Sequence, residues 1–248
     1  SSPREVAGIC HAVITILPAS KEVEEVVLGA NGIMAGAGEG SVVIEMSTSY
    51  PGSTLKINRV LSERGMRMLD APVRGGVMGA VGGTLSVMVG GDEELFREFK
   101  PVFEAMGKNV IHMGDEGAGH TMKAINNLLS ACSMIATSEA VVLAAKAGLE
   151  PARVVNLLQV SSGRSYSTDY KFPTFVLPRK FNAGVPIKLL HKDLDILVRL
   201  GRELNVPMFV ANMVEQMFSY ACSQGKGDLD HTAIIKVLEE WTGVEVHG

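Results

Sequence analysis

The sequence predicts an α/β fold, an incomplete Rossmann-like doubly wound sheet followed by an all-helical C-terminal domain. In the first half, short apolar runs that suit buried strands alternate with helical patterns. From about Ala118 onward, almost nothing interrupts a helix. No G-x-G-x-x-G turn follows the first strand, so we expect the sheet to be incomplete. We place the dinucleotide-binding part at residues 1–116 and the helical domain at 117–248.

The strands are predicted from apolar runs bounded by polar or turn-forming residues. Residues 13–17 form such a run, which ends at Pro18 and suits a buried parallel strand. Further strands are predicted at residues 42–44, 66–69, 85–89 and 110–111. Helices are predicted between them at residues 21–28, 51–64 and 92–106.

The second half is predicted to begin with one long helix over residues 118–147. It is apolar on most sides, which predicts a buried helix. It ends at Gly148, and Pro151 starts the next helix. Three prolines punctuate the stretch before the C-terminal helices. The later helices are predicted at about 151–160, 188–204, 208–224 and 229–240.

Composition is that of a soluble globular protein. The 248 residues are 46% hydrophobic and 20% charged, which permits one large or two smaller domains. A formal net charge of −4 gives no basic field for nucleic acid. No apolar run reaches the ~18 residues of a membrane span, and no secretory signal opens the chain. We therefore expect neither a nucleic acid nor a membrane partner.

The cysteines and histidines predict neither a disulfide framework nor a metal site. Cys10, Cys132 and Cys222 are three widely spaced residues, which fits a reducing cytoplasm. The six histidines show no spacing typical of metal ligands, and His112 and His120 are too isolated to count as evidence for a metal site.

The segment GDEGAGHTMKAINN, residues 114–127, is the most informative stretch. Three glycines lead into a helix start, and Lys123 and Asn127 then lie one turn apart on the same face. An amine can transfer a proton, an amide can hold an oxygen, and glycines let a ligand approach the backbone. The layout suits proton transfer at a substrate hydroxyl. The alternative is an exposed lysine beside a helix cap.

Five motifs in order resemble the β-hydroxyacid dehydrogenase family, which includes 3-hydroxyisobutyrate dehydrogenase and tartronate semialdehyde reductase. The resemblance covers nearly the whole chain, and residues 161–166 (SSGRSY) and 241–244 (WTGV) look closest to the 2-(hydroxymethyl)glutarate branch. The five motifs are ITILP at 14–18, MST at 46–48, DAPVRGG at 70–76, the 114–127 segment and LHKDL at 190–194.

The resemblance implies hydride transfer between NAD or NADP and a small 3-hydroxy acid or its semialdehyde. Lys123 would be the general acid/base, its pKa of about 10.4 lowered by burial or by the positive nicotinamide. Asn127 would position Lys123 or the substrate oxygen. The resemblance also implies a homodimer or homotetramer built through the helical domains.

The other implied site residues surround the substrate and the cofactor. The amides of Gly75 and Gly76 would orient the substrate carboxylate. Residues that resemble the cofactor side of the family site are Leu17, Pro18, Thr48 and Lys192. Lys192 has the alternative of a surface lysine at a helix start, and Asp193 is predicted to cap or pair within its helix.

Arg74 departs from the family, which usually has serine at this position. An arginine could hold the carboxylate bidentately, turn to solvent, or fill the site and shrink the accepted substrate. Arg74 is therefore a candidate substrate-binding residue with these alternatives open.

The family's N-terminal GxGxMG segment is also absent from the sequence. Without it the pyrophosphate has no helix N-terminus to bind, so we expect this chain to bind NAD(P) weakly or not at all. Calorimetric titration showing micromolar binding would contradict that expectation. One alternative is a non-catalytic helical dimerisation remnant with a broken cofactor site. Another is a 6-phosphogluconate dehydrogenase relative, against which the short helical domain and the DAPV loop argue.

Overall fold

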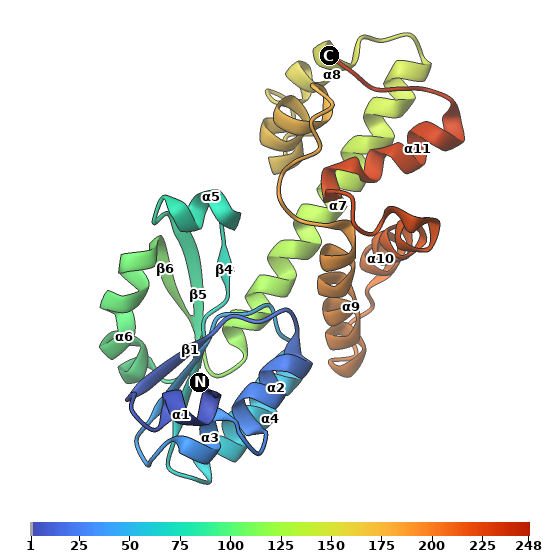
Figure 1. Ribbon diagram of the computed structural model, residues 1–248. Helices are drawn as coiled ribbons and strands as arrows, with labels where there is room; N and C mark the ends of the chain where they lie inside the picture. Colours follow the sequence, from blue (N-terminus) through green and yellow to red (C-terminus); the bar gives the residue numbers. More distant parts are fainter. Residues whose placement is uncertain (1) are drawn as a thin grey trace. The chain divides into compact units, whose positions relative to one another are not determined.

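The computed structural model describes residues 2–248 and divides into two compact units, Ser1–Ile125 (unit 1) and Asn126–Gly248 (unit 2) (Figure 1). The division falls inside the long helix α7 (Ala118–Lys146), shortly after the helix begins. The sequence places the boundary near Gly117, immediately before that helix.

Unit 1 contains one sheet, in which the described residues form six strands in the order β1-β2-β3-β5-β4, with β6 also paired to β5. The first three strands are parallel, whereas β5 runs antiparallel to β3 and β4 and parallel to β6. The predicted α/β class is confirmed. The strands are β1 (Ala12–Thr15), β2 (Val42–Glu45), β3 (Arg67–Asp70), β4 (Val73–Arg74), β5 (Leu85–Gly90) and β6 (Gly107–Gly114).

Helices cover both faces of this sheet because its central strands are apolar on both sides. Val42 and Ile44 of β2 belong to a core with the phenylalanines of α6, whereas Val43 belongs to a second core with α2 and α4. Figure 1 shows α6 on one side of the strands and α2 and α4 on the other. The helices are α1 (Pro3–Ala7), α2 (Ser20–Leu28), α3 (Ile33–Gly36), α4 (Pro51–Ser62), α5 (Gly76–Val81) and α6 (Glu93–Met106).

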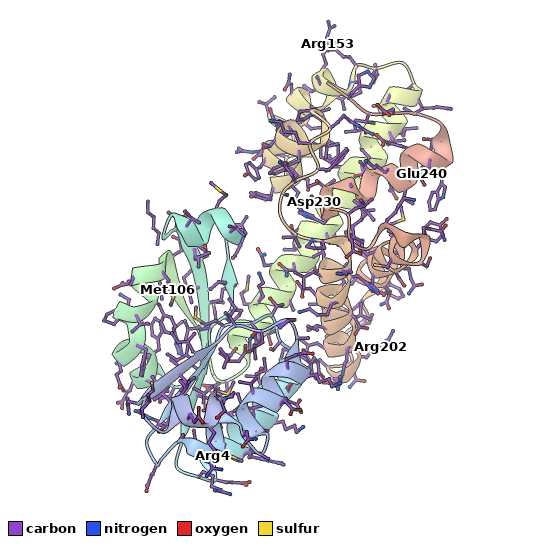
Figure 2. All side chains as sticks on the ribbon, in the orientation of Figure 1. Arg4, Met106, Arg153, Arg202, Asp230 and Glu240 are labelled. Atoms are coloured by element: carbon purple, nitrogen blue, oxygen red, sulfur yellow. The ribbon has the colours of Figure 1, made fainter. Side chains whose placement is uncertain are left out.

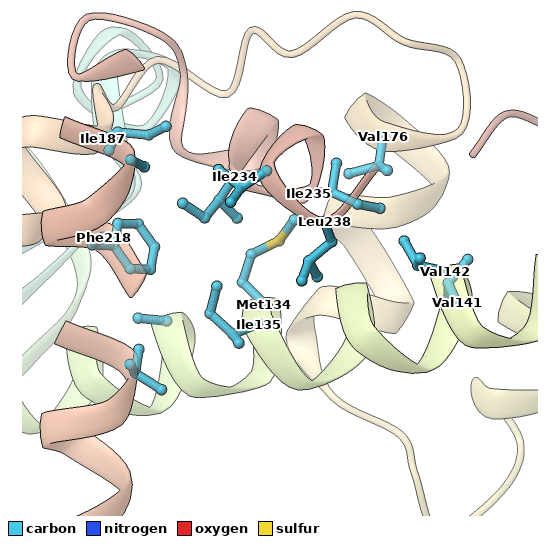
Figure 3. Packing of buried hydrophobic residues seen from close by; sticks show 14 of the residues in the cluster. Met134, Ile135, Val141, Val142, Val176, Ile187, Phe218, Ile234, Ile235 and Leu238 are labelled. Atoms are coloured by element: carbon cyan, nitrogen blue, oxygen red, sulfur yellow. The ribbon is translucent and has the colours of Figure 1, made fainter. Parts of the chain in front are cut away.

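Unit 2 is built from helices, and none of its described residues forms a strand, as predicted. Met134, Ile187, Phe218 and Ile234 lie in its core (Figure 3), and charged side chains such as Arg153 point outward (Figure 2). After α7 come α8 (Pro151–Leu158), η1 (Ser167–Val176), α9 (Ile187–Glu203), α10 (Phe209–Ala221), η2 (Cys222–Lys226), η3 (His231–Ile234) and α11 (Ile235–Thr242).

The π-helix η1 differs from the sequence prediction, in which prolines interrupt this stretch. Pro173 lies inside the helix, where its missing N–H removes an i→i+5 bond to the Thr168 carbonyl. The side-chain amide of Gln159 donates to that carbonyl at 3.0 Å. The carbonyl is therefore satisfied, and the helix continues past the proline.

Helix α7 is less buried than its composition predicts. Ala131 and Met134 are fully buried in the core of unit 2, but Leu129 is 64% exposed and Leu143 is 70% exposed. By length and composition alone, α7 also meets the requirements for crossing a membrane. A core helix meets the same requirements, so this finding is weak support for a membrane.

Candidate active site

The beginning of α7 rests directly on the backbone of the sheet. A Cβ on Gly119 would overlap the Met88 carbonyl oxygen and lie 2.6 Å from the Asp70 carbonyl oxygen. Gly117 has a φ of +85°, a conformation that L side chains rarely adopt. Contact with the strands thus explains Gly119 and backbone conformation explains Gly117, where the sequence suggested an approach for a ligand.

Asp70, at the end of β3, holds the first turn of α7. Its Oδ1 accepts a hydrogen bond from the Gly117 amide at 2.8 Å, and its Oδ2 accepts one from the His120 amide at 2.8 Å. These amides belong to the group that a helix start leaves unsatisfied, and a negative charge there is favourable. Burial nevertheless raises the pKa of the Asp70 carboxyl, since desolvation outweighs these bonds.

His120 is the centre of a buried polar cluster that joins three elements. Its Nδ1 lies 2.8 Å from the Thr54 hydroxyl of α4, and its Nε2 lies 2.9 Å from Glu45 Oε2 at the end of β2. Burial disfavours the charged imidazole, but the Glu45 and Asp70 carboxylates outweigh burial and raise the pKa of His120. Burial likewise disfavours the charged form of Glu45, but the interaction with His120 outweighs this effect and lowers the pKa of Glu45.

This cluster predicts a loss of stability at alkaline pH. A raised pKa means that the charged His120 stabilises the folded state fully below its ordinary value of 6.5. That contribution disappears as the pH rises through the folded-state pKa. Urea unfolding at a series of pH values above 6.5 should show the decline, and His120→Gln should reduce it. His112→Gln, which alters a partly buried histidine on β6, should leave it unchanged; an identical decline in all three proteins would contradict the assignment.

Lys123 lies beside the segment that the sequence predicts to bind substrate. Its Nζ donates to the Val73 carbonyl at 2.7 Å, and Arg74, which follows Val73 in β4, is exposed. Gly75 and Gly76 come next, with φ values of +133° and +60°, and they open the short helix α5 instead of a loop. The structure therefore brings the proposed proton-transfer amine next to the Arg74–Gly75–Gly76 segment.

The predicted cofactor residues of unit 1 lie at the carboxyl ends of β1 and β2. The Leu17 amide donates to the Ser47 hydroxyl at 2.8 Å, which ties together the two turns that carry Pro18 and Thr48. Ligands of open α/β sheets bind at such strand ends. The buried Ser49 hydroxyl has no hydrogen-bond partner among residues 2–248, so this edge offers an unused polar group and fits a nicotinamide cofactor.

In unit 2 the structure brings Asn127 together with the Lys-Asp motif. The Asn127 side-chain amide donates to Asp193 Oδ2 at 2.7 Å, and Lys192 Nζ lies 3.2 Å from Asp193 Oδ1. The sequence assigns Asp193 only to its own helix, but its carboxylate also orients Asn127 of α7. The spacing within LHKDL carries no signal for this contact between two helices.

Sequence reasoning also missed the roles of Glu45, Asp70 and His120. Each carboxylate ends a strand directly after apolar residues, as in VVIE and RMLD. A charged residue at the end of an apolar strand sequence is the one signal that could have indicated a buried, paired carboxylate.

Comparisons with known proteins agree with this geometry. Residues 1–114 match the family described as the NAD binding domain of 6-phosphogluconate dehydrogenase. Residues 117–238 match the one described as NAD-binding of NADP-dependent 3-hydroxyisobutyrate dehydrogenase. The 2-(hydroxymethyl)glutarate dehydrogenase of Eubacterium barkeri is 40% identical over 245 residues, covering 99% of this chain and 81% of the relative. The chain belongs to the β-hydroxyacid dehydrogenase family.

Two further members of the family match a similarly large share of this chain. The 2-hydroxy-3-oxopropionate reductase of Escherichia coli (strain K12) is 35% identical, over 95% of this chain and 80% of that enzyme. The solved structure of 3-hydroxyisobutyrate dehydrogenase from Mycobacterium tuberculosis with L-serine has a TM-score of 0.86 at 30% identity. It matches 95% of this chain and 81% of its own chain.

As a member of this family, the protein is an NAD(P)-dependent oxidoreductase, as predicted. The reading as a non-catalytic remnant gains no support, because these relatives are enzymes. The helical half matches the 3-hydroxyisobutyrate dehydrogenase description and residues 1–114 match the 6-phosphogluconate dehydrogenase description, so these two matches do not test the sequence argument against a 6-phosphogluconate dehydrogenase.

Proposed function

We propose that the protein interconverts a small 3-hydroxy acid and its semialdehyde, with Lys123 as the general acid/base. The observation that carries this proposal is the Lys123 amine, held 2.7 Å from the Val73 carbonyl beside the Arg74–Gly75–Gly76 segment. NAD or NADP, when bound, supplies the two-electron acceptor or donor.

In the oxidising direction Lys123 must accept the proton of the substrate hydroxyl. A neutral amine can donate one N–H to the Val73 carbonyl while its lone pair takes this proton. The carbon that bears the hydroxyl loses its hydrogen with two electrons, and the carbonyl product forms. In the reducing direction the ammonium of Lys123 returns the proton.

The remaining residues bind and orient. Asn127, fixed by Asp193, is assigned to hold the substrate oxygen. The amides of Gly75 and Gly76 are assigned to the substrate carboxylate, and Leu17, Pro18, Thr48 and Lys192 to the cofactor side. A 3-hydroxy acid with deuterium on the hydroxyl-bearing carbon tests the reaction type. The deuterium should appear in the reduced nicotinamide, and its release to water would contradict hydride transfer.

Arg74 is assigned to a second carboxylate of the substrate. It is an exposed arginine directly before the two glycines, and its planar fork of donors matches a carboxylate. The 40% identical relative is named for 2-(hydroxymethyl)glutarate, a dicarboxylate. These observations support a preference for a dianionic substrate.

Arg74→Ser is therefore expected to lower kcat/KM for a hydroxymethyl diacid by about 1.5–3 kcal/mol, as for a hydrogen bond to a charged group. Monocarboxylates such as 3-hydroxyisobutyrate should be spared. The control is Arg67→Ser, which removes an exposed arginine bound to Glu98. Equal losses on both substrate types would make Arg74 structural, and no loss on either would place it outside the substrate site.

The protein is further proposed to be a cytoplasmic homodimer or homotetramer without a nucleic acid or membrane partner. Exposed apolar side chains on unit 2 support association: Phe209 is 80% exposed and Met213 is 75% exposed on α10, in addition to Leu129 and Leu143. The three free cysteines are compatible with a reducing compartment. Sedimentation velocity at micromolar concentration should show a dimer or tetramer, and a monomer would contradict the proposal.

A further inference from the structure

Three buried titratable side chains lie at the start of α7, and proton transfer by Lys123 uses none of them. Glu45 is 0% exposed, and Asp70 and His120 are each 1% exposed. Burying charged groups is costly unless they are paired and hydrogen-bonded. These three satisfy that condition through one another, through the first turn of α7, and through hydrogen bonds with Ser47 and Thr54.

The surroundings of the His120 ring are those of an imidazolium. Nδ1 lies 2.8 Å from the Thr54 hydroxyl, which can donate or accept there, and 3.6 Å from the carboxylate oxygen Oδ2 of Asp70. On the other side, Nε2 lies 3.1 Å from the Ser47 carbonyl and 2.9 Å from Glu45 Oε2. Both ring nitrogens face acceptors, and an imidazole donates from both only when it is protonated.

The charged groups that face this ring come from two strand ends. Glu45 is the last residue of β2, and Asp70, the last residue of β3, lies 3.6 Å from Nδ1 through its Oδ2. The packed α4 contributes the uncharged Thr54. Along the chain, Glu116 comes before α7 begins, and Lys123 follows His120 by one turn of α7. The ring thus joins β2, α4 and α7, while the Asp70 carboxylate joins β3 to the same helical turn.

The same segment of unit 1 holds both the helix start and the amine. Asp70 binds the amides of Gly117 and His120, and three residues later the Val73 carbonyl accepts from Lys123 Nζ. Residues three apart on a helix lie on one face, about 5 Å from each other. A shift of the His120 turn therefore moves Lys123 against Val73.

We propose that His120 is a positioning residue for Lys123. Protonated and held by Glu45 and Asp70, its ring fixes the first turn of α7 on the strand ends and so keeps the Lys123 amine at the Val73 carbonyl. This inference rests on the proposed function, in which Lys123 transfers the proton.

The test compares His120→Gln with the control His112→Gln in the enzyme with its cofactor and a 3-hydroxy acid substrate. His120→Gln should lower kcat about 10- to 100-fold, the size expected for a small misplacement of a reacting group. KM for NAD(P) should change by a smaller factor than kcat, because the substitution acts on the transition state through the Lys123 amine. His112→Gln should match wild type. Wild-type kcat in His120→Gln would overturn the inference.

A pH profile separates positioning from general support of the fold. Losing a positive charge one turn from Lys123, and leaving Glu45 without its partner, favours the protonated amine. In the oxidising direction the pH midpoint of kcat should therefore move upward in His120→Gln. Glu45→Gln should share the kcat loss. An unmoved midpoint with a folded His120→Gln protein would contradict positioning.

A double substitution shows through which residue His120 acts. In a Lys123→Ala background, His120→Gln should lower kcat by less than about 2-fold, since coupled residues are strongly non-additive. An equal loss in both backgrounds would overturn the inference while leaving the proposed function intact. Full activity of Lys123→Ala alone would instead refute the proposed function.

Discussion

Replacing Lys123 by Ala in the complete enzyme is expected to lower kcat about 10²–10⁴-fold, the usual contribution of a general acid/base. Alanine removes the amine that the Val73 carbonyl holds at 2.7 Å, and no group is left there to accept the hydroxyl proton. Affinity for NAD(P) should change little, because the predicted cofactor residues lie at the ends of β1 and β2. Steady-state kinetics and calorimetric titration of the cofactor measure the two quantities.

The matched control is Lys100→Ala in unit 1. Lys100 forms an ion pair with Glu104 on its own helix at 2.9 Å, and both side chains are about half exposed. Such surface pairs contribute about 0–1 kcal/mol to stability, so this variant should keep wild-type turnover. A Lys123→Ala protein with near-full turnover would show that another group transfers the proton.

Gly119→Ala is expected to destabilise the protein by about 3 kcal/mol or more, the upper range for overpacking a close contact. The added Cβ would meet the Met88 and Asp70 carbonyl oxygens and come within 2.9 Å of Asp70 Oδ2. All three belong to the strand ends on which α7 rests, so the backbone itself must shift. Urea unfolding should show a lower midpoint without a change in slope.

Gly38→Ala is the control for that measurement. No heavy atom lies within 4 Å of a Cβ built on Gly38, and its φ is not positive. The substitution should therefore be neutral or slightly stabilising. Equal midpoints for Gly119→Ala and wild type would mean that α7 does not rest on the sheet as described.

Most of the fold could be predicted because its elements carry their own patterns. The strands β2 and β5 are apolar runs, and α6 and α9 have clear amphipathic periods. The two-residue strand β4 and the six-residue helix α5 are too short to show any period. The reversal of β5 against β3 was also invisible, since a buried run reads the same in either direction.

The candidate site likewise contains residues that the sequence could indicate and residues that it could not. Lys123 and Asn127 could be proposed as candidates because one helical turn separates them along the chain. His120 could not, because its partners are distant: Ser47 lies 73 residues away in sequence. The glycines were expected to let a ligand approach the backbone, whereas tertiary contact with the sheet supplies the reason for Gly119.

The central claim is that this β-hydroxyacid dehydrogenase transfers hydride between NAD(P) and a 3-hydroxy acid. The most direct measurement incubates the full-length enzyme with a panel of mono- and dicarboxylic 3-hydroxy acids and each oxidised cofactor, and follows the absorbance of the reduced nicotinamide. We predict cofactor reduction with at least one 3-hydroxy acid, faster for a diacid than for 3-hydroxyisobutyrate. No reduction with any 3-hydroxy acid and either cofactor would contradict the account.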